Sequence, residues 1–266
     1  MQMTRLGGAP ELNVDMGILV GILLTDGSIS KKHNSYSIEL SGKSKRLHEI
    51  FKEKMKRLGT SKFLEICDSR YPDIRRTIVN DGKVAKSLLG IVPTFRTKQF
   101  ENGNFPPAKL PEFIFDLNSK ERSAVLQAMF SCDGCISLWI VRNKRWDVWE
   151  IKKWVKFACK HPRIRKQVYE LLAGFGYNPV IREENDEILL TKKKDIVKFA
   201  REIRFLDGVK VTKDSRNWEG FEKNSVLDFA VESYSIKQDA IRNFNRKELI
   251  SFIKSALNSS GHPTAS

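Results

Sequence analysis

Two short stretches of the sequence are alike: LVGILLTDG at residues 19–27 and LQAMFSCDG at residues 126–134. They lie 107 residues apart, and each is an apolar, helix-like run that ends in Asp-Gly. Glycine readily takes the left-handed conformation that ends many helices. We therefore expect one helix to end at Gly27 and a second to end at Gly134.

The residue before each glycine is an aspartate, Asp26 in the first stretch and Asp133 in the second. The C-terminus of a helix carries partial negative charge, so a carboxylate there is unfavourable without a cation. A divalent metal ion would supply that cation. Asp-Gly is also a common turn dipeptide, which explains one occurrence, but two occurrences in register favour metal binding.

Small residues recur at the same place in both helical runs. Gly17 and Gly21 are four residues apart, as are Ala124 and Ala128, and the offset is again 107. Small side chains at this spacing allow two helix backbones to approach closely. We expect the two helices to pack side by side through these residues, with Asn13 as the N-cap of the first.

The similarity continues beyond the two motifs, now with an offset of 117 residues. The matched pairs are Ile38 with Val155, Leu40 with Phe157, and Lys43 with Lys160. The larger offset indicates about ten extra residues in the hairpin of the second half. Each half is predicted to run helix, strand, strand, helix, strand, strand, helix, with Gly59 and Gly176 ending the middle helices.

Together, the two motifs and the repeat resemble the LAGLIDADG homing endonucleases over about residues 14–210. The resemblance implies an α+β fold with two pseudo-symmetric αββαββα repeats. It also implies a saddle of antiparallel β-sheets with the paired LAGLIDADG helices at its centre. Because both repeats lie in one chain, the resemblance is to the single-chain, monomeric type, which can cut an asymmetric site.

The motifs and the stretches between them divide the chain into five predicted segments. They are an N-terminal arm (1–13), a first LAGLIDADG half (14–100), a linker (101–111), a second LAGLIDADG half (112–213) and a C-terminal helical extension and tail (214–266). The linker, ENGNFPPAKLP, contains the Gly and Pro typical of connecting segments. Towards the C-terminus, residues 213–229 are predicted to be loop-like and residues 233–257 helical.

The predicted strands alternate polar and apolar residues. In SYSIELS at residues 35–41, Ile38 and Leu40 form the apolar face of a half-buried strand. The polar face is free to enter a DNA major groove, where a β-ribbon can read base edges, or is simply solvated. Counting alternate residues gives the candidate DNA contacts Ser28, Ser30, Lys32, Ser37, Glu39, Ser41, Arg75, Thr77, Ser137, Trp139, Lys152, Trp154, Lys156, Arg182 and Glu184.

The composition favours a polyanionic partner. The formal net charge is +15, although charge alone does not distinguish DNA from RNA or acidic lipid. No apolar run reaches transmembrane length, and residues 1–12 lack the apolar segment of a signal peptide. We expect an intracellular protein that binds no membrane, in the cytoplasm of a prokaryote or inside the organelle that encodes it.

Cysteine and histidine are too sparse to indicate a disulfide framework or a zinc site. There are four cysteines, and Cys132 and Cys135 form a C-x-x-C without the second pair that a zinc site needs. The four histidines show no ligand spacing. An HNH-type nuclease is therefore not expected.

The resemblance implies that Asp26 and Asp133 bind Mg²⁺ together with the backbone carbonyls of Thr25 and Cys132. Mn²⁺ is expected to substitute for Mg²⁺, and Ca²⁺ is expected to bind without supporting cleavage. The metals would activate a water at each scissile phosphate and stabilise the leaving 3′ oxygen.

Lys43 and Lys160 match each other at the end of the second strand of each half, where relatives place a basic residue near the phosphate. The resemblance implies a catalytic role in which they stabilise transition-state charge or help with a water proton. The alternative is that they are ordinary phosphate-facing lysines. Many relatives carry Gln beside this lysine, whereas this chain has Gly42 and Cys159.

The resemblance therefore implies a site-specific DNA endonuclease of the intron-encoded type. It would act as a monomer on a long double-stranded DNA site of low symmetry and leave short 3′ overhangs. Two alternatives stay open: a maturase that binds intron RNA on the same fold, and a DNA-binding protein that does not cut. The presence of both aspartates argues against either alternative as the sole role.

Overall fold

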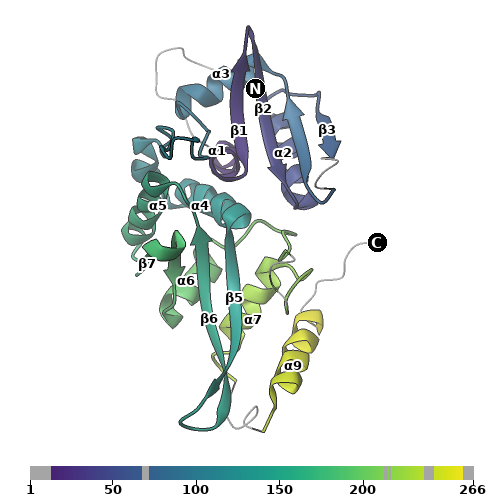
Figure 1. Ribbon diagram of the computed structural model, residues 1–266, viewed down its shortest axis with the longest axis vertical. Helices are drawn as coiled ribbons and strands as arrows, with labels where there is room; N and C mark the ends of the chain where they lie inside the picture. Colours follow the sequence, from purple (N-terminus) through teal and green to yellow (C-terminus); the bar gives the residue numbers. More distant parts are fainter. Residues whose placement is uncertain (1–12, 68–71, 213–214, 216, 237–242, 260–266) are drawn as a thin grey trace. The chain divides into compact units, whose positions relative to one another are not determined.

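The computed structural model describes residues 13–67, 72–212, 215, 217–236 and 243–259 (Figure 1). The chain forms two compact units, Met1–Met129 and Phe130–Ser266. Apart from Asn13, the predicted N-terminal arm lies outside the described residues, as does the end of the predicted tail. No helix in the described part of the chain is long and apolar enough to cross a membrane.

The first unit contains a four-stranded antiparallel sheet with the strand order β1-β2-β4-β3. Its elements are α1 (Val14–Thr25), β1 (Gly27–Lys32), β2 (Ser35–Gly42), α2 (Lys45–Arg57), β3 (Leu64–Cys67), β4 (Arg75–Val79), α3 (Gly82–Ile91), the 3₁₀ helix η1 (Glu112–Asp116) and the first part of α4 (Ser119–Asp133). The three helices α1, α2 and α3 pack against β2, and Ile38 and Leu40 of that strand are buried. From α1 to α3 the order is the predicted αββαββα repeat.

The second unit repeats this topology, with the strand order β5-β6-β8-β7. After α4 its elements are β5 (Gly134–Asn143), β6 (Val148–Ala158), α5 (Pro162–Gly174), β7 (Val180–Arg182), the 3₁₀ helix η2 (Glu183–Asn185), β8 (Glu187–Leu190), α6 (Lys193–Glu202), α7 (Lys223–Glu232) and α9 (Arg246–Ser259). All strand pairs of this sheet are antiparallel. The predicted α+β class and its two repeats are thus confirmed.

The two sheets differ mainly in their first hairpin. β5 and β6 have 10 and 11 residues, whereas β1 and β2 have 6 and 8. Figure 1 shows β5 and β6 as a long two-stranded ribbon. Arg142 and Asp147 form an ion pair of 2.6 Å where this ribbon turns. The extra residues predicted for the second hairpin therefore lengthen both of its strands.

Helix α1 is buried along most of its length. Its N-cap is Asn13, whose Oδ1 accepts a hydrogen bond from Met16 N at 2.9 Å. Residues 17–24 are all buried. A helix that is apolar on every side needs cover on every side, and both the first sheet and the first part of α4 cover α1.

The contact between α1 and α4 depends on small residues. A Cβ atom on Gly21 would lie 2.6 Å from Val125 O and 2.7 Å from Ala128 Cβ. A Cβ atom on Gly17 would lie 3.6 Å from Ala124 Cβ. These four small residues, singled out from the sequence, therefore lie where the two helix backbones come closest within the first unit.

Each motif helix passes directly into a strand. A Cβ atom on Gly27 would lie 2.6 Å from Leu23 Cδ2, and one on Gly134 would lie 2.6 Å from Phe130 O. Neither glycine has a positive φ, so the predicted left-handed helix end is wrong here. The strand begins at once, and glycine is required because the backbone packs too closely for a side chain. Gly59, after α2, does have a positive φ of 94°.

Four phenylalanines form the aromatic core of the second unit. The ring of Phe130 lies 5.2 Å from that of Phe157 and 5.0 Å from that of Phe199, and Phe199 lies 5.4 Å from Phe205. Such tilted pairs add to the free energy gained by burial alone. The cluster joins α4 to β6, to α6 and to the segment that follows α6.

The C-terminal extension packs on the second sheet, because both α7 and α9 contact β5. The prediction of a loop over residues 213–229 is wrong from Lys223 onward, where α7 begins. Val226 and Leu227 are fully buried, so tertiary packing overrides the turn-like sequence at the start of this helix. The predicted helical stretch at 233–257 contains most of α9. It is wrong for the described residues 233–236 and 243–245, which are not helical.

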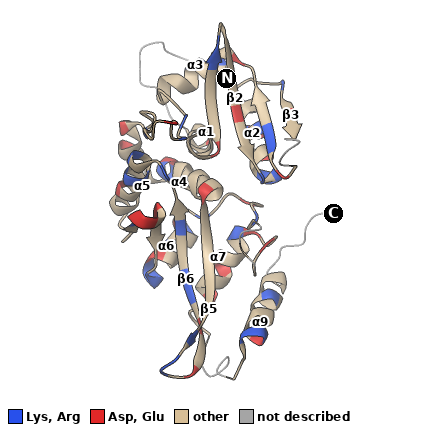
Figure 2. Ribbon diagram, viewed as in Figure 1, with Lys and Arg blue, Asp and Glu red and all other residues tan. Residues whose placement is uncertain are grey.

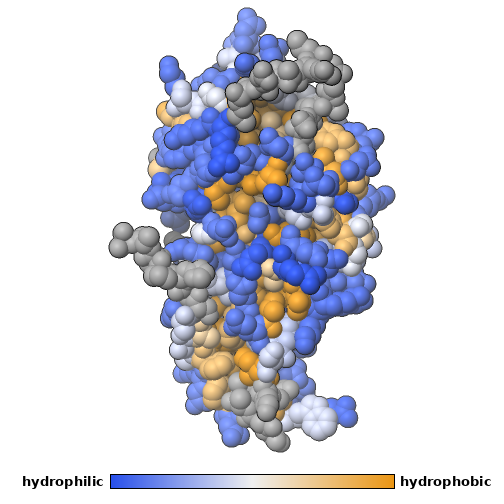
Figure 3. All heavy atoms as spheres, turned by 180° about the vertical axis from the view of Figure 1, so that it is seen from behind, coloured by the Kyte–Doolittle hydropathy of each residue, from blue (hydrophilic) through white to orange (hydrophobic). Residues whose placement is uncertain are grey.

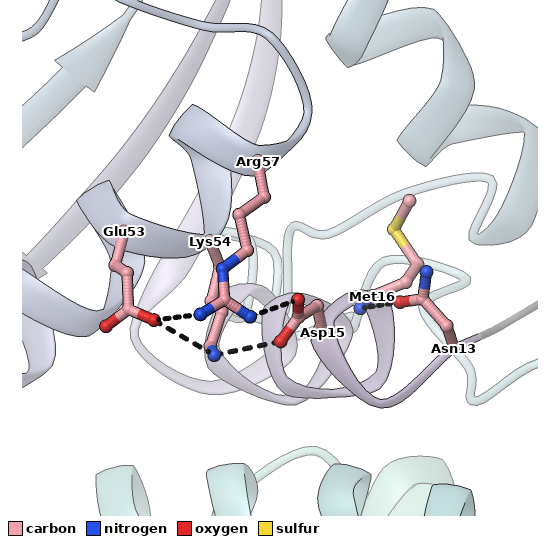
Figure 4. A network of polar contacts seen from close by, with 6 residues as sticks. All are labelled: Asn13, Asp15, Met16, Glu53, Lys54 and Arg57. Carbon is pink, nitrogen blue, oxygen red and sulfur yellow. Dashed lines mark hydrogen bonds and ion pairs between the residues drawn. The ribbon is translucent and has the colours of Figure 1, made fainter. Parts of the chain in front are cut away.

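Ion pairs hold the start of α1 against the end of α2 (Figure 4). Lys54 Nζ lies 2.8 Å from Asp15 Oδ1, and Arg57 Nη1 lies 2.7 Å from Asp15 Oδ2. Glu53 pairs with both cations. Partial burial raises the pKa of Asp15, but the hydrogen bonds from Lys54 and Arg57 outweigh it and hold this pKa below its usual value. The helix that carries Asp26 is thereby fixed to α2.

Replacing Gly21 with alanine should destabilise the first unit, because the added methyl group collides with α4. We expect a loss of about 1–3 kcal/mol in the free energy of unfolding, measured by denaturant titration. Gly90→Ala is the matched control: Gly90 is an exposed residue of α3 whose Cβ would meet nothing within 4 Å. It should stabilise the chain by about 0.5–1 kcal/mol. Equal changes in the free energy of unfolding for the two variants would contradict a close contact between α1 and α4 at Gly21.

Replacing Asp15 with asparagine should lower stability at neutral pH by about 1 kcal/mol. The folded pKa of Asp15 lies below its usual value of 3.8, so its contribution is present above that pH and is lost as pH falls through the folded pKa. The difference in melting temperature between parent and variant should shrink below about pH 3.8. Glu53→Gln, at the exposed edge of the same network, should cost less, and a constant difference at all pH values would contradict the assignment.

Candidate active site

In the first unit, Asp26 lies at the junction of α1 and β1. It is the C-cap of α1, and its carbonyl accepts a hydrogen bond from Ser41 N at 3.0 Å. Its carboxylate lies beside Gly42, because a Cβ atom there would be 3.6 Å from Asp26 Oδ2. Lys43 follows directly and is exposed. The fold thus brings the predicted acid and lysine to the same end of the sheet.

The second unit repeats this arrangement around Asp133, the last residue of α4. Cys159 stands where the first unit has Gly42. Burial, together with the negative charge of Asp133, raises the pKa of Cys159 to about 12. The thiol therefore stays protonated at neutral pH and lies near the carboxylate. Lys160 follows Cys159 directly and is exposed.

A buried side chain holds the carbonyl that precedes each lysine. His48 Nε2 lies 3.2 Å from Gly42 O, and Arg165 Nη1 donates to Cys159 O at 2.7 Å. His48 and Arg165 are only 3% and 5% exposed, and they are separated by the same 117 residues as the two lysines. The two repeats thus fix equivalent peptide groups with different residue types. The sequence analysis did not identify His48 or Arg165 as anchors. The 117-residue offset does place them at equivalent positions in the two halves.

The two anchors meet the cost of burial in different ways. A carbonyl oxygen only accepts, so Nε2 of His48 carries the proton and Nδ1 accepts from Thr77 Oγ1 at 2.7 Å. Burial lowers the pKa of His48, which favours this neutral form. The buried guanidinium of Arg165 is instead paired with Asp186, at 2.7 Å, and with Glu183.

The polar face of the first sheet includes the predicted residues of β1 and β2. They are Ser28, Ser30 and Lys32 on β1, and Ser37, Glu39 and Ser41 on β2. Residues directly opposite each other in an antiparallel pair share a face, and the register pairs Ser28 with Glu39. Ile29 and Ile38 form a pair on the other face, where Ile38 is fully buried.

Arg75 and Thr77 lie on the helix-covered face of this sheet rather than on its polar face. The register pairs Arg75 with Gly42 and Thr77 with Leu40, and Thr77 is only 1% exposed. The prediction that these two residues lie on the polar face is therefore wrong. Arg76, which lies between them in the sequence, is on the polar face instead.

Arg75 and Arg182, both predicted to contact DNA, do not occupy equivalent positions in the two halves. Loops of different length separate the strands in the two halves, so the offset between equivalent residues changes along the chain. Val79 pairs with Ile38 of β2, and Leu190 pairs with Val155, the matched residue of β6. Val79 and Leu190 are therefore equivalent, and they lie 111 residues apart. Arg182 belongs to the edge strand β7, whereas Arg75 belongs to the inner strand β4.

The polar face of the second sheet carries both aromatic and basic residues. The predicted residues on it are Ser137 and Trp139 on β5, and Lys152, Trp154 and Lys156 on β6. The rings of Trp139 and Trp154 lie 5.9 Å apart, and Trp139 is 60% exposed. Figure 2 shows blue, basic segments along β6 and in the turn of its hairpin. Hydrophilic residues also cover most of the surface seen in Figure 3.

The edge of the second sheet matches the prediction in part. Arg182 lies opposite Glu187, which lies opposite Ala158 of β6, so Arg182 shares the polar face. Glu184 lies in the 3₁₀ helix η2, where strand alternation does not apply. The prediction that Glu184 belongs to a strand face is therefore wrong.

Equivalent ion pairs on the two polar faces have exchanged their charges. Arg76 Nε lies 2.6 Å from Glu39 Oε1 in the first unit, and Lys156 Nζ lies 3.4 Å from Glu187 Oε2 in the second. The register makes Glu39 equivalent to Lys156 and Arg76 equivalent to Glu187. The two faces therefore present different charge patterns at equivalent points.

The oxygen donors near the helix ends fit a hard divalent cation. Carboxylate oxygens of Asp26 and Asp133 and carbonyl oxygens of Thr25 and Cys132 are the ligand type that Mg²⁺ and Ca²⁺ prefer. Gly42, lacking a side chain, leaves room beside the first carboxylate. Among the described residues, no group of three or more His, Cys, Asp or Glu side chains could hold a metal alone. A cation would need additional oxygens, as Mg²⁺ sites obtain from water and substrate phosphates.

Both halves of the sequence match known families. Residues 120–204 match the LAGLIDADG-like domain, and residues 16–91 match the WhiA LAGLIDADG-like domain. Together the two regions make up more than half of the 266 residues. The predicted linker at 101–111 lies between them. No curated protein matches the sequence.

Solved structures share the fold over nearly the whole chain. The I-LtrWI LAGLIDADG homing endonuclease bound to target DNA is 14% identical, with a TM-score of 0.53 over 94% of this chain and 99% of that chain. The LAGLIDADG meganuclease I-AabMI bound to uncleaved DNA is 12% identical, with a TM-score of 0.52 over 94% of this chain and 99% of that chain. With a LAGLIDADG-like domain in each half and this fold throughout, the chain belongs to the LAGLIDADG family.

Proposed function

We propose that this protein is a site-specific DNA endonuclease that uses divalent metal ions. The observation that carries the proposal is the repeated helix end. Asp26 lies beside Gly42 and Asp133 near Cys159, and an exposed lysine directly follows Gly42 and Cys159 in the chain. I-LtrWI and I-AabMI, which share the fold, are a homing endonuclease and a meganuclease bound to DNA. Their activity supports the same reaction class for this chain.

The polar faces of the two sheets are the proposed DNA-binding surfaces. A two-stranded antiparallel ribbon fits the major groove of B-DNA and can read base edges there. Lys152 is exposed on the second face, beside the exposed ring of Trp139. The net charge of +15 would add sequence-independent attraction to phosphates. Affinity would then come mainly from lysine and arginine, and specificity from the polar and aromatic side chains.

Chain groups near the helix ends have distinct proposed roles in the chemistry. Divalent cations, one bound at Asp26 and one at Asp133, would each lower the pKa of a water and stabilise charge on a leaving oxygen. Lys43 and Lys160 would offset the charge that develops on the phosphate. Cys159 is not a nucleophile in this scheme, because its raised pKa keeps the thiol protonated.

Differences between the two faces favour a target of low symmetry. Glu39 and Lys156 occupy equivalent positions but carry opposite charges, so the two halves would not read the same sequence. We propose that one chain binds a long double-stranded site as a monomer and cuts both strands with Mg²⁺. The short 3′ overhangs and the intron-encoded origin are the expectations that the family resemblance supplies.

Cleavage of a randomised DNA library in Mg²⁺ tests this proposal directly. We expect discrete double-strand cuts by the parent chain, and Asp26→Asn and Asp133→Asn should each lower the rate by about 100-fold or more, because a catalytic metal contributes several kcal/mol. Mn²⁺ should support the reaction, and Ca²⁺ should support binding only. Asp116→Asn, which changes an exposed acid in η1, is the control and should cut normally.

Two outcomes would contradict the endonuclease proposal. Tight duplex binding without any cut in Mg²⁺ or Mn²⁺ would indicate a DNA-binding protein that keeps the fold. Cutting that survives both aspartate substitutions would mean that the hydrolysis occurs elsewhere or comes from a contaminant.

Two consecutive lysines test which face of the second sheet binds DNA. Lys152 lies on the polar face, whereas Lys153 points to the covered face, where its ammonium lies 3.7 Å from the ring centre of Tyr234. Lys152→Met should weaken duplex binding and lower the slope of log affinity against log salt by about 1. Lys153→Met should leave the slope unchanged. Fluorescence anisotropy at several salt concentrations measures both, and equal slopes for the two variants would refute the assignment of the face.

A further inference from the structure

A buried lysine from the C-terminal extension reaches the end of the second motif helix. Lys223, the first residue of α7, is only 5% exposed. Its ammonium group donates to Ser131 O at 2.7 Å and to Gly134 O at 2.6 Å. These two carbonyls lie on either side of Cys132 and Asp133 in the chain. One side chain therefore bridges the segment that carries the second aspartate.

The position of Lys223 follows from the electrostatics of a helix end. The last carbonyls of a helix lack partners within the helix and carry partial negative charge. A buried ammonium is costly unless its hydrogen bonds are satisfied. The last turn of α4 and the first residue of β5 each supply one acceptor to Lys223. The ring of Phe205, centred 5.5 Å from the ammonium, offers it a further favourable contact. Lys223 thus supplies the cation that the sequence of α4 does not.

Further hydrogen bonds tie the same region to the extension. Ser131 Oγ accepts from Leu206 N at 2.7 Å. Asn224, beside Lys223, accepts from Phe205 N and donates to Phe205 O, each at 3.0 Å, and it also donates to Asp207. All of these atoms are buried or half-buried. The end of α4 is therefore held by a polar network whose other side is the start of α7.

The first repeat stabilises its helix end in a different way. Thr25 Oγ1 donates to Gly21 O at 2.9 Å and lies 3.0 Å from Ile22 O, so this hydroxyl bonds back onto the preceding turn of its own helix. The residue equivalent to Thr25 is Cys132, whose thiol is a weak donor. The second repeat instead has Lys223, which comes from another part of the chain and bonds Ser131 O and Gly134 O.

We propose that Lys223 is a positioning residue for the second half of the active site. By fixing the peptide groups on both sides of Cys132 and Asp133, it pre-organises the Asp133 carboxylate and the Cys132 carbonyl for a divalent cation. Metal ligands depend on such outer contacts for their orientation. The inference rests on the proposed function, because it assigns Lys223 to the same metal-dependent site.

Binding of Mn²⁺ to the full chain with duplex DNA, followed by electron paramagnetic resonance, tests this role without cleavage. Lys223→Met removes the donor and keeps most of the side-chain volume, and it should lower Mn²⁺ affinity by about 10- to 100-fold. A purely electrostatic role predicts the opposite, because removal of a nearby positive charge would raise cation affinity. Lys254→Met, an exposed lysine of α9, is the matched control and should bind Mn²⁺ like the parent.

A second substitution, Lys223→Arg, distinguishes a positioning role of Lys223 from a general effect on stability. Lys223→Arg keeps a cationic donor and should recover at least part of the Mn²⁺ affinity that Lys223→Met loses. On the cleavable target, Lys223→Met should bind DNA in Ca²⁺ as tightly as the parent but accumulate nicked DNA. Unchanged Mn²⁺ affinity in a folded Lys223→Met variant would overturn the proposal, as would weaker binding with no rescue by arginine.

A measurement on the parent chain covers the case in which Lys223→Met does not fold. Mn²⁺ should broaden the nuclear magnetic resonance signal of the Lys223 ammonium but not that of Lys254, and Asp133→Asn should remove the broadening. A sharp Lys223 signal would overturn the proposal. If Mn²⁺ binding depends on both Asp133 and Lys223 but no DNA is cut, the endonuclease proposal fails while the positioning role stands. If cutting needs Asp133 but substitution of Lys223 changes neither Mn²⁺ binding nor nicking, the positioning role fails while the endonuclease proposal stands.

Discussion

At Gly27 and Gly134 a helix becomes a strand within a single residue, and the backbone there packs too tightly for any side chain. This close packing sets the direction in which the chain leaves each motif helix. It also sets the place of Asp26 and Asp133, because each comes directly before its glycine. A looser connection would let the carboxylates move relative to the lysines that follow β2 and β6. The geometry of both helix ends therefore depends on this steric constraint.

Much of the fold could be predicted from one sequence because the sequence contains the repeat twice. The 107-residue offset matched Gly17 and Gly21 with Ala124 and Ala128, and these residues do line the contact between α1 and α4. Strand alternation assigned the faces of the first two strands in each half, since a short hairpin fixes their register. It failed for Thr77, because the loop before β4 shifts the register by an amount that alternation cannot reveal.

Contacts between distant segments had no signal in the local sequence pattern. His48 and Arg165 hold equivalent carbonyls, but one is a neutral imidazole and the other a guanidinium paired with acids. Lys223 lies in a stretch that resembled a loop, since Asn and Ser follow it directly. Burial against α4 and β5 determines the helix there. Such contacts arise when helices and strands that are distant in the sequence pack together, so a local sequence pattern cannot predict them.

The exchanged ion pairs on the two polar faces limit how the repeats can be recombined. If β6 alone were transplanted into the first sheet, Lys156 would come to lie beside Arg76; if β2 alone were moved into the second, Glu39 would face Glu187. Either chimera would bring like charges together at a partly buried point of the sheet. The inner two strands of each sheet therefore depend on each other, and any redesign of target preference that exchanges strands between repeats must move each pair together.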